Sequence, residues 1–525
     1  MGGHRLGSEF QTNKDGDSIA FTWVWLAISS LSVIPIWLVQ YPPLVDYPNH
    51  LARCYILFHL HNVPEYHKMY TADWSPAPNL GLDLLCYVLQ CLFDVSIAGK
   101  IALTITVVLF CCGAILLSHA LWKKVIWGAP IVASFAINSY FLYGFVNYCL
   151  GLAFYMCLLA IWLQFFRRKG LMLFALTVAF AVICYIIHLS AYVCFATSII
   201  SYLVVSQRRD WTALLHSILL LLVFFLLSSF SETQYGAKIT WNSIAGKTVV
   251  LFSPIRTYNW RFDAVVILTV IVTAFVLVRS GRPVLTNGFA ILNAIVLLVL
   301  YLALPKEMAS VSGVDARFVL PAFVLLLLST DLSKGGKRNT TLTALLVLYC
   351  AALVRGFYIS KVWVEQDTTS VKYASLFSVL PRGSWVFPIT HLPKHVDQNK
   401  KERTYVHFVH YSTIQRKTFS PTLFTIPGQQ PLRRLANEPY VEANATSPEQ
   451  VDWQRVLERY DYLWCYDISA DWIAPYRARL RPLRTADRVA IYEVVKLPSA
   501  PPPLRPSPSG KARDDSPTRA GPPSH

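Results

Sequence analysis

The residues best suited to chemistry stand together in the segment 46–53 (DYPNHLAR), directly after the first long apolar run. Asp46, His50 and Arg53 are spaced i, i+4 and i+7, so they would share one face of a short helix that begins near Pro48. A carboxylate of this kind can act as a general base, and cationic side chains can bind phosphate. Ionisable groups beside a membrane cost free energy, which makes the segment a candidate functional site.

Composition places this segment in a membrane protein. Of the 525 residues, 54% are hydrophobic and 15% are charged, whereas soluble domains carry about 25% charged residues. The apolar residues come in blocks that approach the roughly 20 residues needed to cross a bilayer. We therefore expect an α-helical polytopic protein with about eleven transmembrane helices, at 20–40, 97–121, 125–143, 146–166, 170–187, 189–206, 212–230, 263–279, 285–304, 317–332 and 340–358.

The chain has a formal charge of +17, and many of its basic residues lie in the connectors between these blocks. This distribution does not indicate a nucleic-acid partner. The turns near 143–145 and at His188 carry no Lys or Arg, and the connectors on the other side do. Because basic connectors stay in the cytoplasm, the N-terminus (1–19) is predicted to be cytoplasmic. The basic connectors are Lys123-Lys124, Arg167-Arg168-Lys169, Arg208-Arg209, Arg279 with Arg282, and Lys334 with Lys337-Arg338.

Composition also divides the chain into regions. The first span, 20–40, is typical of a signal anchor, and a long extracytoplasmic loop with juxtamembrane helices follows at 41–96. The transmembrane bundle is expected at 97–359. A soluble extracytoplasmic α/β domain is expected at 360–497, and the Pro-rich tail, 498–525, is expected to be disordered.

The cysteines predict neither a disulfide framework nor a metal site. Most of the eleven lie within predicted spans, where Cys acts as a small apolar residue. Cys54, Cys86, Cys91 and Cys465 are predicted to face outside, so a disulfide among them is the alternative to free thiols. No CxxC pair occurs, and a divalent cation stays an alternative that no motif signals.

This layout resembles the GT-C superfamily of membrane glycosyltransferases over 21–497. The motif that carries the resemblance is 45–50 (VDYPNH), where the family places a catalytic carboxylate at the opening of its first external loop. Many members have two acids there, and this chain has Asp46 alone. The segments 144–151 (GFVNYCLG) and 315–318 (DARF) also resemble recurring patterns in bacterial relatives.

The resemblance implies a bacterial-type member of the inner membrane that acts at the extracytoplasmic face. It would move a sugar from a polyprenyl-phosphate donor to a glycan, lipid or protein acceptor, with inversion. Such a reaction needs a base near the acceptor hydroxyl and cations where phosphate charge develops.

Asp46 is the predicted base, and a plain helix N-cap is the alternative. Asp73 is a candidate second carboxylate, and a solvated surface acid is its alternative. The candidates for binding the donor phosphate are cationic or can become so: His50, Arg53, His188, Arg256, Arg261 and Arg317.

For three charged or titratable side chains near or within the spans, a purely structural role is the alternative to a functional one. His188 would satisfy backbone carbonyls between two spans. Arg317 would pair with Asp315 or extend to the lipid headgroups, and Arg355 would also extend to the headgroups.

Other function classes stay open from the sequence. A transporter or flippase of lipid-linked saccharides would place charge or broken helices near mid-bilayer, whereas polar residues here gather at the outer ends of the spans. A non-catalytic assembly subunit would tolerate loss of Asp46. A polymerase or ligase of the O-antigen type would use external Arg and His rather than an acid.

Overall fold

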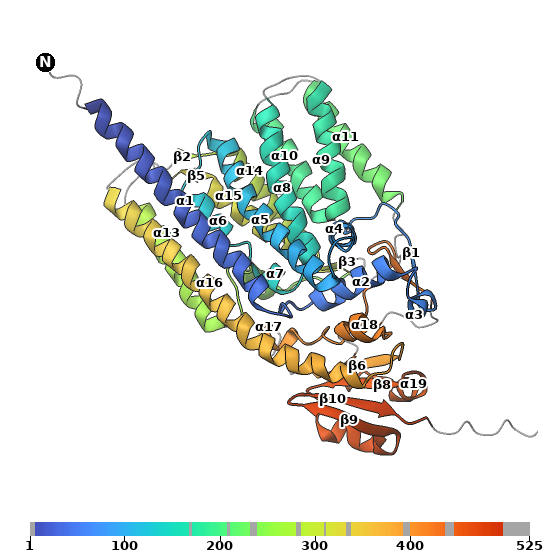
Figure 1. The fold of residues 1–525 in the computed structure, drawn as a ribbon. Helices are drawn as coiled ribbons and strands as arrows, with labels where there is room; N and C mark the ends of the chain where they lie inside the picture. The colour runs from blue at the N-terminus through green and yellow to red at the C-terminus, as the bar shows by residue number, and fades with distance from the viewer. Residues whose placement is uncertain are drawn as a thin grey trace, which may run out of the picture.

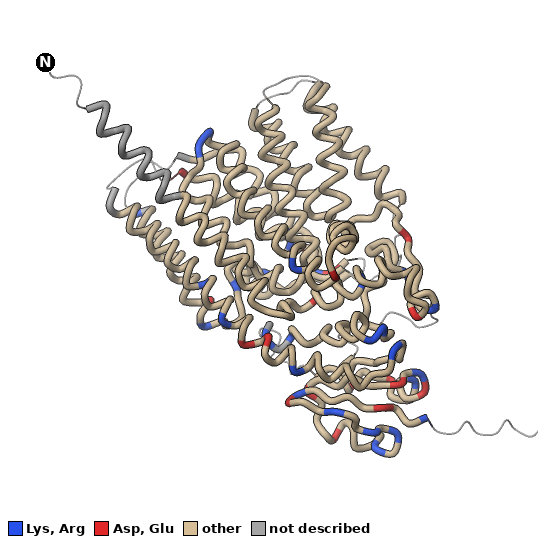
Figure 2. The backbone as a smooth tube through the Cα atoms, viewed as in Figure 1, with Lys and Arg blue, Asp and Glu red and all other residues tan. Residues whose placement is uncertain are grey.

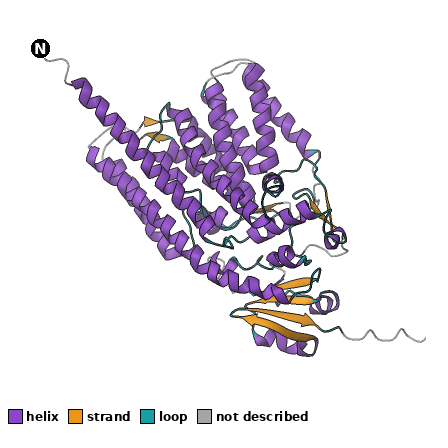
Figure 3. Cartoon of the chain, viewed as in Figure 1, coloured by secondary structure: helices purple, strands orange, loops and turns teal. Residues whose placement is uncertain are grey.

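The computed structural model describes residues 6–166, 171–206, 211–230, 239–279, 285–308, 311–331, 338–391, 400–435, 441 and 446–496. Helices make up most of this part of the chain, and the largest sheet lies near its C-terminal end (Figures 1 and 3). Several sequence predictions lie wholly or partly outside it: the cytoplasmic N-terminus, the disordered tail, and the basic residues 167–169, 208–209, Arg282, Lys334 and Lys337.

The described residues include five helices that are long and apolar enough to cross a bilayer. The outward faces of α11 and α13 carry exposed Leu, Ile, Val and Phe side chains, as expected where lipid replaces water. Charged residues are sparse along the bundle and dense in the C-terminal part (Figure 2). The chain is therefore a multi-pass membrane protein. The five are α5 (Val95–Trp122), α8 (Val146–Phe165), α11 (Trp211–Ser228), α13 (Trp260–Arg279) and α16 (Arg338–Ser375).

Shorter apolar helices complete the bundle. The predicted pair of spans interrupted at His188 forms α9 (Leu171–Ile187) and α10 (Leu189–Val205). The other members are α1 (Leu6–Leu38), α14 (Gly288–Ala303) and, after the 3₁₀ turn η1 (Ala316–Phe318), α15 (Val319–Leu328).

The predicted span at 125–143 is wrong. This segment forms two short helices, α6 (Gly128–Ala133) and α7 (Ser139–Leu142), neither long enough to cross a bilayer. Asn138 begins α7, because its side chain accepts hydrogen bonds from the N–H groups of Tyr140 and Phe141. Residues 128–142 are all buried, so this apolar run is protein core rather than a lipid-facing helix. The total of about eleven transmembrane helices stays a prediction.

The loop at 41–96 joins the bundle to the C-terminal part (Figure 1). It contains α2 (Tyr47–His59), α3 (Pro64–His67), β1 (Tyr70–Ala72), α4 (Gly81–Leu89) and turns. β1 pairs antiparallel with β7 (Leu432–Arg434). Ile56 and Leu57 of α2 share a buried apolar cluster with Phe387 and Leu463 of the C-terminal sheet. Burial of this surface ties α2 to elements more than 300 residues further along the chain.

The C-terminal part is built on a four-stranded sheet in the order β6-β8-β10-β9. β6 and β8 are parallel, and the other neighbours are antiparallel. Between β6 and β8 the chain passes through α17 (Lys400–Arg403) and α18 (His410–Arg416), and α18 packs on α2. Residues 360–375, which the sequence assigned to this domain, continue α16. The remaining elements here are β6 (Val386–Thr390), α19 (Trp453–Arg459), β8 (Tyr462–Tyr466), α20 (Ala470–Ile473), β9 (Leu480–Ala486) and β10 (Val489–Val494).

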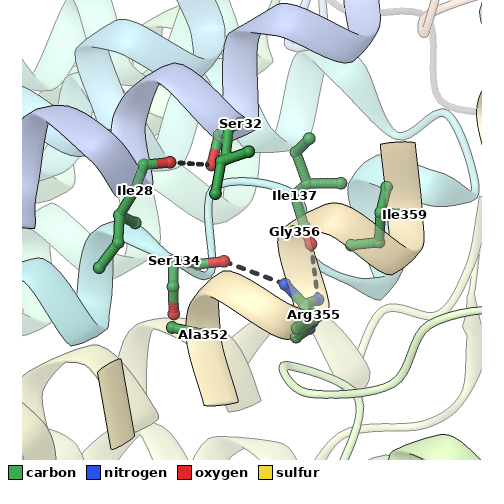
Figure 4. Close-up of a pocket in the computed structure, with 9 residues that line it drawn as sticks. Ile28, Ser32, Ser134, Ile137, Ala352, Arg355, Gly356 and Ile359 are labelled. Atoms are coloured by element: carbon green, nitrogen blue, oxygen red, sulfur yellow. Dashed lines mark hydrogen bonds between the residues drawn. The ribbon is translucent and has the colours of Figure 1, made fainter. Parts of the chain in front are cut away.

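Arg355 of α16 does not extend to the headgroups as expected but is buried among the helices (Figure 4). Its Nε donates to the carbonyl of Ile255 at 3.1 Å. Nη1 and Nη2 donate to the carbonyls of Ser134 and Ile137 at 3.0 and 2.6 Å. These carbonyls lie beyond the ends of short helices, where the helices supply no partners. Arg355 thus stabilises the segment that replaces the predicted span.

Replacing Arg355 should destabilise the bundle. Arg355→Met would leave three buried carbonyls without donors, each at a cost of about 1–3 kcal/mol. The thermal unfolding midpoint in detergent should therefore fall clearly. Lys361→Met, on the same helix with its side chain 75% exposed, should change the midpoint little. Equal midpoints for the two variants would contradict this account of Arg355.

Candidate functional site

Asp46 is held by its backbone against the turn between α7 and α8. The N–H groups of Val45 and Asp46 donate to the carbonyls of Leu142 and Tyr143 at 3.3 and 3.0 Å. Gly144 in this turn has φ +84°, and a Cβ atom there would lie 2.6 Å from the Asp46 nitrogen. Only glycine meets both conditions without strain. The glycine that opens the 144–151 motif therefore sets the position of the acid.

The carboxyl group of Asp46 is free of the helix that follows it. Asp46 occupies the N-cap position of α2, but its side chain makes no capping hydrogen bond. The side chain is 18% exposed, and its Oδ1 lies 3.5 Å from Nε2 of His407. Burial raises the pKa of Asp46 to about 7, while the charges of Arg403 and Arg317 act in the opposite direction. Near neutral pH this acid can both hold and release a proton.

Arg317 reaches the same place from the start of α15. The Tyr148 hydroxyl donates to the Arg317 carbonyl at 2.8 Å, and this contact fixes the backbone of η1. The guanidinium lies over the Phe145 ring, 5.7 Å from its centroid. Its Nε is buried and makes no hydrogen bond within the described part of the chain. Two of the motifs in the sequence, 144–151 and 315–318, thus meet beside Asp46.

Asp315 does not neutralise Arg317. Its Oδ2 accepts a hydrogen bond from Asn242 Nδ2 at 2.9 Å and pairs with Lys247 Nζ at 3.3 Å. Oδ1 accepts from the N–H of Ala316 at 2.8 Å. The local pair between Asp315 and Arg317, considered from the sequence, is therefore replaced by a pair with Lys247.

His50 and Arg53 follow Asp46 on α2, and both side chains are buried within the protein. Arg53 is fully buried, and its Nε and Nη2 donate to the two carboxylate oxygens of Asp83 on α4, at 2.8 and 2.9 Å. This bidentate pair ties α2 to α4 and directs the guanidinium away from Asp46. The ring of His50 packs at 5.4 Å against Phe424, and burial lowers its pKa well below the usual range. A neutral imidazole and a guanidinium paired with a carboxylate are poorly suited to bind phosphate, so the structure does not favour these two predicted ligands.

The remaining predicted residues lie in different surroundings. Asp73 pairs with Arg433 at 3.0 Å beside β1. Hydrogen bonds from Ser75, and then from Arg433, lower the pKa of Asp73 to about 2. Asp73 is therefore an ionised acid held by Ser75 and Arg433 next to β1, rather than the freely solvated acid of its alternative interpretation.

His188, a predicted phosphate ligand, lies near Arg317. Its ring packs against Tyr148 at 5.6 Å, and its Nδ1 accepts from the N–H of Ser190 at 3.1 Å. It therefore caps α10 instead of satisfying carbonyls. Arg256 lies in the turn after α12 (Ile244–Val250), and Arg261 lies in the first turn of α13 near Trp260.

Sequence reasoning missed three residues of this group: Asn49, Arg403 and His407. Asn49 is a buried residue of α2, and its side chain hydrogen-bonds to His407 and to the segment 422–424. Arg403 ends α17 and acts on Asp46 through its charge. All three depend on the C-terminal part folding back on α2, a contact between residues more than 350 positions apart that leaves no local pattern.

No group of three or more His, Cys, Asp or Glu side chains suited to a metal ion occurs among the residues that the structure describes. The eleven cysteines are all free thiols. The site itself combines one carboxylate whose pKa lies near 7, two guanidinium groups and a neutral imidazole. This arrangement can accept a proton from a hydroxyl while it binds an anion beside it.

Comparison with known proteins gives a fold but no family. No family model matches the chain, and no curated protein sequence matches it. Its structure is similar to ArnT from Cupriavidus metallidurans bound to undecaprenyl phosphate, with a TM-score of 0.52 and 10% identity, over 91% of this chain and 98% of ArnT. The apo state of the same protein matches with a TM-score of 0.52 and 9% identity over the same shares. The chain therefore shares the overall fold of ArnT.

Gly144 allows a direct test of the backbone contact that positions Asp46. Gly144→Ala should destabilise the protein and displace Asp46, because Ala is strained at φ +84° and its Cβ would lie 2.6 Å from the Asp46 nitrogen. Gly288→Ala is the matched control, since nothing lies within 4 Å of a Cβ there. Thermal unfolding in detergent should separate the two variants, with a lower midpoint for Gly144→Ala alone. A midpoint equal to that of Gly288→Ala would contradict the contact.

Proposed function

We propose that the chain is a membrane glycosyltransferase that moves a sugar from a polyprenyl-phosphate donor to an acceptor hydroxyl, with Asp46 as the general base. The observation that supports the proposal is that the charges of Arg317 and Arg403 both act on the buried Asp46, in a chain whose fold is similar to that of ArnT. One acid and two guanidiniums are the groups that this reaction requires. The acceptor would be a glycan, a lipid or a protein.

Asp46 would remove the proton of the acceptor hydroxyl as that oxygen attacks the anomeric carbon. The C–O bond to the phosphate breaks with the electron pair going to the phosphate oxygen, and the sugar configuration inverts. Phosphate is a good leaving group, so no general acid is needed. Burial raises the pKa of Asp46 to about 7, against the opposing charges of Arg403 and Arg317. A base is most effective when its pKa lies near the working pH.

Arg317 and Arg403 would bind the donor phosphate. Arg317 has a buried Nε without a hydrogen-bond partner among the described residues, and it can offer this N–H to an oxyanion. Guanidinium groups match phosphate oxygens with a planar fork of donors. ArnT, the similar structure, binds undecaprenyl phosphate. By this similarity we assign a polyprenyl phosphate carrier to the present site.

The reaction would take place at the extracytoplasmic face of a bacterial inner membrane. α5 is 28 residues long, or about 42 Å at 1.5 Å per residue, and it begins close to α4 and ends at Lys123-Lys124. These lysines therefore lie at the end of the bundle opposite to Asp46. The positive-inside rule assigns such lysines to the cytoplasm, which supports an external position for the site.

Removal of the proposed base tests this function. Asp46→Asn should lower the rate of sugar release from a polyprenyl-phosphate donor by about 10²–10⁴-fold, the usual contribution of a general base. Asp73→Asn is the control, because Asp73 directly follows β1 and accepts hydrogen bonds from Arg433 and Ser75. It should keep nearly full activity.

The outcomes separate the competing functions. Full activity of Asp46→Asn would refute the base and would favour chemistry that depends on Arg and His. Transport of the lipid-linked sugar without sugar release, unchanged in Asp46→Asn, would favour a flippase.

The pH profile should report the ionisation of Asp46. The base must be charged, so kcat/KM should fall as the pH drops below about 7, the pKa of Asp46 in the free enzyme. Bound phosphate would neutralise Arg403 and Arg317, the two charges that lower this pKa. The acid limb of kcat should therefore lie at higher pH than that of kcat/KM. Limbs in the opposite order, or no acid limb between pH 5 and 9, would contradict the assignment.

A further inference from the structure

The orientation of the Asn49 side chain is fixed by two backbone groups. Its Oδ1 accepts a hydrogen bond from the N–H of Phe424 at 2.8 Å, and an N–H can only donate. Its Nδ2 donates to the carbonyl of Thr422 at 2.8 Å, and a carbonyl can only accept. The oxygen and nitrogen of the amide are therefore distinguished by their partners.

This orientation determines where His407 carries its proton. Asn49 Nδ2 lies 3.2 Å from His407 Nδ1, and its second proton points to this ring nitrogen. An amide nitrogen does not accept hydrogen bonds, so Nδ1 must be the acceptor and carries no proton. Burial lowers the pKa of His407 to about 4, which keeps the ring neutral at neutral pH. The one remaining ring proton then sits on Nε2.

The protonated Nε2 faces the carboxyl group of Asp46. The distance from Nε2 to Oδ1 is 3.5 Å, and it needs only a small movement to become a hydrogen bond. Catalytic hydrogen bonds are often long before substrate binds. Asn49 is fully buried, and the His407 side chain is 6% exposed. Water therefore competes little for either group.

We propose that Asn49 and His407 are positioning residues that orient the Asp46 carboxylate, with His407 donating from Nε2 to Oδ1. This role rests on the proposed function. With Oδ1 held in this way, Oδ2 is left to accept the proton of the substrate hydroxyl. The arrangement also limits how far Arg317 and Arg403 can pair with both oxygens of the acid and weaken it as a base.

A neutral donor suits this role better than a cation. A protonated imidazole beside Asp46 would add a third positive charge and lower the basicity of the acid further. The other charged and titratable groups close to the Asp46–His407 pair are Arg317 and Arg403, whose charges act on Asp46, and His50 and His410, which neighbour His407. Because His407 belongs to the C-terminal part and Asp46 to the first loop, the base is complete only when these parts are docked.

The ring tautomer of His407 can be measured without any assay of activity. In the full-length protein labelled with ¹⁵N-histidine, the signals absent from His407→Gln identify His407. We expect Nε2 protonated and Nδ1 bare, with no change between pH 6 and 8. A proton on Nδ1, or an imidazolium in this range, would overturn the inference whatever the enzyme does.

Steady-state kinetics tests whether the hydrogen bond from His407 to Asp46 contributes to catalysis. His407→Leu removes the donor, whereas His407→Gln places an amide N–H close to where Nε2 lies. We expect kcat to fall about 10²-fold in His407→Leu, the effect of a misplaced catalytic group. The Gln variant should recover most of this loss, and KM for the donor should be unchanged in both. Because a hydrogen bond to the charged form lowers the pKa of an acid, the acid limb should move to higher pH in His407→Leu.

The control variant is His391→Gln, which changes a half-exposed histidine of the same C-terminal part. It should match the wild-type enzyme in kcat and in the acid limb. Wild-type kcat in His407→Leu, or equal loss in the Leu and Gln variants with both folded, would overturn the positioning role. If the wild-type protein releases no sugar, the proposed function fails while the tautomer measurement still stands.

Discussion

Two stretches of backbone approach each other at Gly144 so closely that no side chain fits between them. The N–H of Asp46 reaches the carbonyl of Tyr143 there, and a Cβ on Gly144 would lie 2.6 Å from the Asp46 nitrogen. Every other feature of the site is arranged around the acid that this contact fixes. Gly144 also begins the segment whose Phe145 and Tyr148 hold Arg317, so one turn positions both the acid and one of its cations. This backbone contact supports the position of the acid independently of any side-chain hydrogen bond.

The electrostatics of the site follow from keeping buried charges in balance. The Arg53–Asp83 pair is fully buried and bidentate, and it ties α2 to α4 without adding net charge. Removing one partner of such a pair leaves an uncompensated charge, which typically costs about 3–5 kcal/mol. Beside it, the charges of Arg317 and Arg403 both act on Asp46. Burial lowers the pKa of His50 and of His407, so both rings are neutral and add no charge to this group.

Local chemistry in the sequence located the acid, and long-range packing determined its partners. Asp46 and Arg317 both stood out because a charged group beside an apolar run is rare, and their roles in catalysis are proposals. The pairing of Arg53 with Asp83 was not foreseen, because Asp83 lies 30 positions away on another helix. The predicted span at 125–143 failed because complete burial within protein and burial in lipid select the same apolar residues. His407, Arg403 and Asn49 come together only through the docking of the C-terminal part on α2.

The central claim is that a polyprenyl phosphate binds between Arg317 and Arg403 beside Asp46. The most direct test is a cryo-EM structure of the full-length protein in nanodiscs with undecaprenyl phosphate. The account predicts phosphate density within hydrogen-bond distance of both guanidiniums, with the carboxyl group of Asp46 facing the space where the sugar would sit. Phosphate density elsewhere on the protein, with Asp46 turned away from it, would contradict the account.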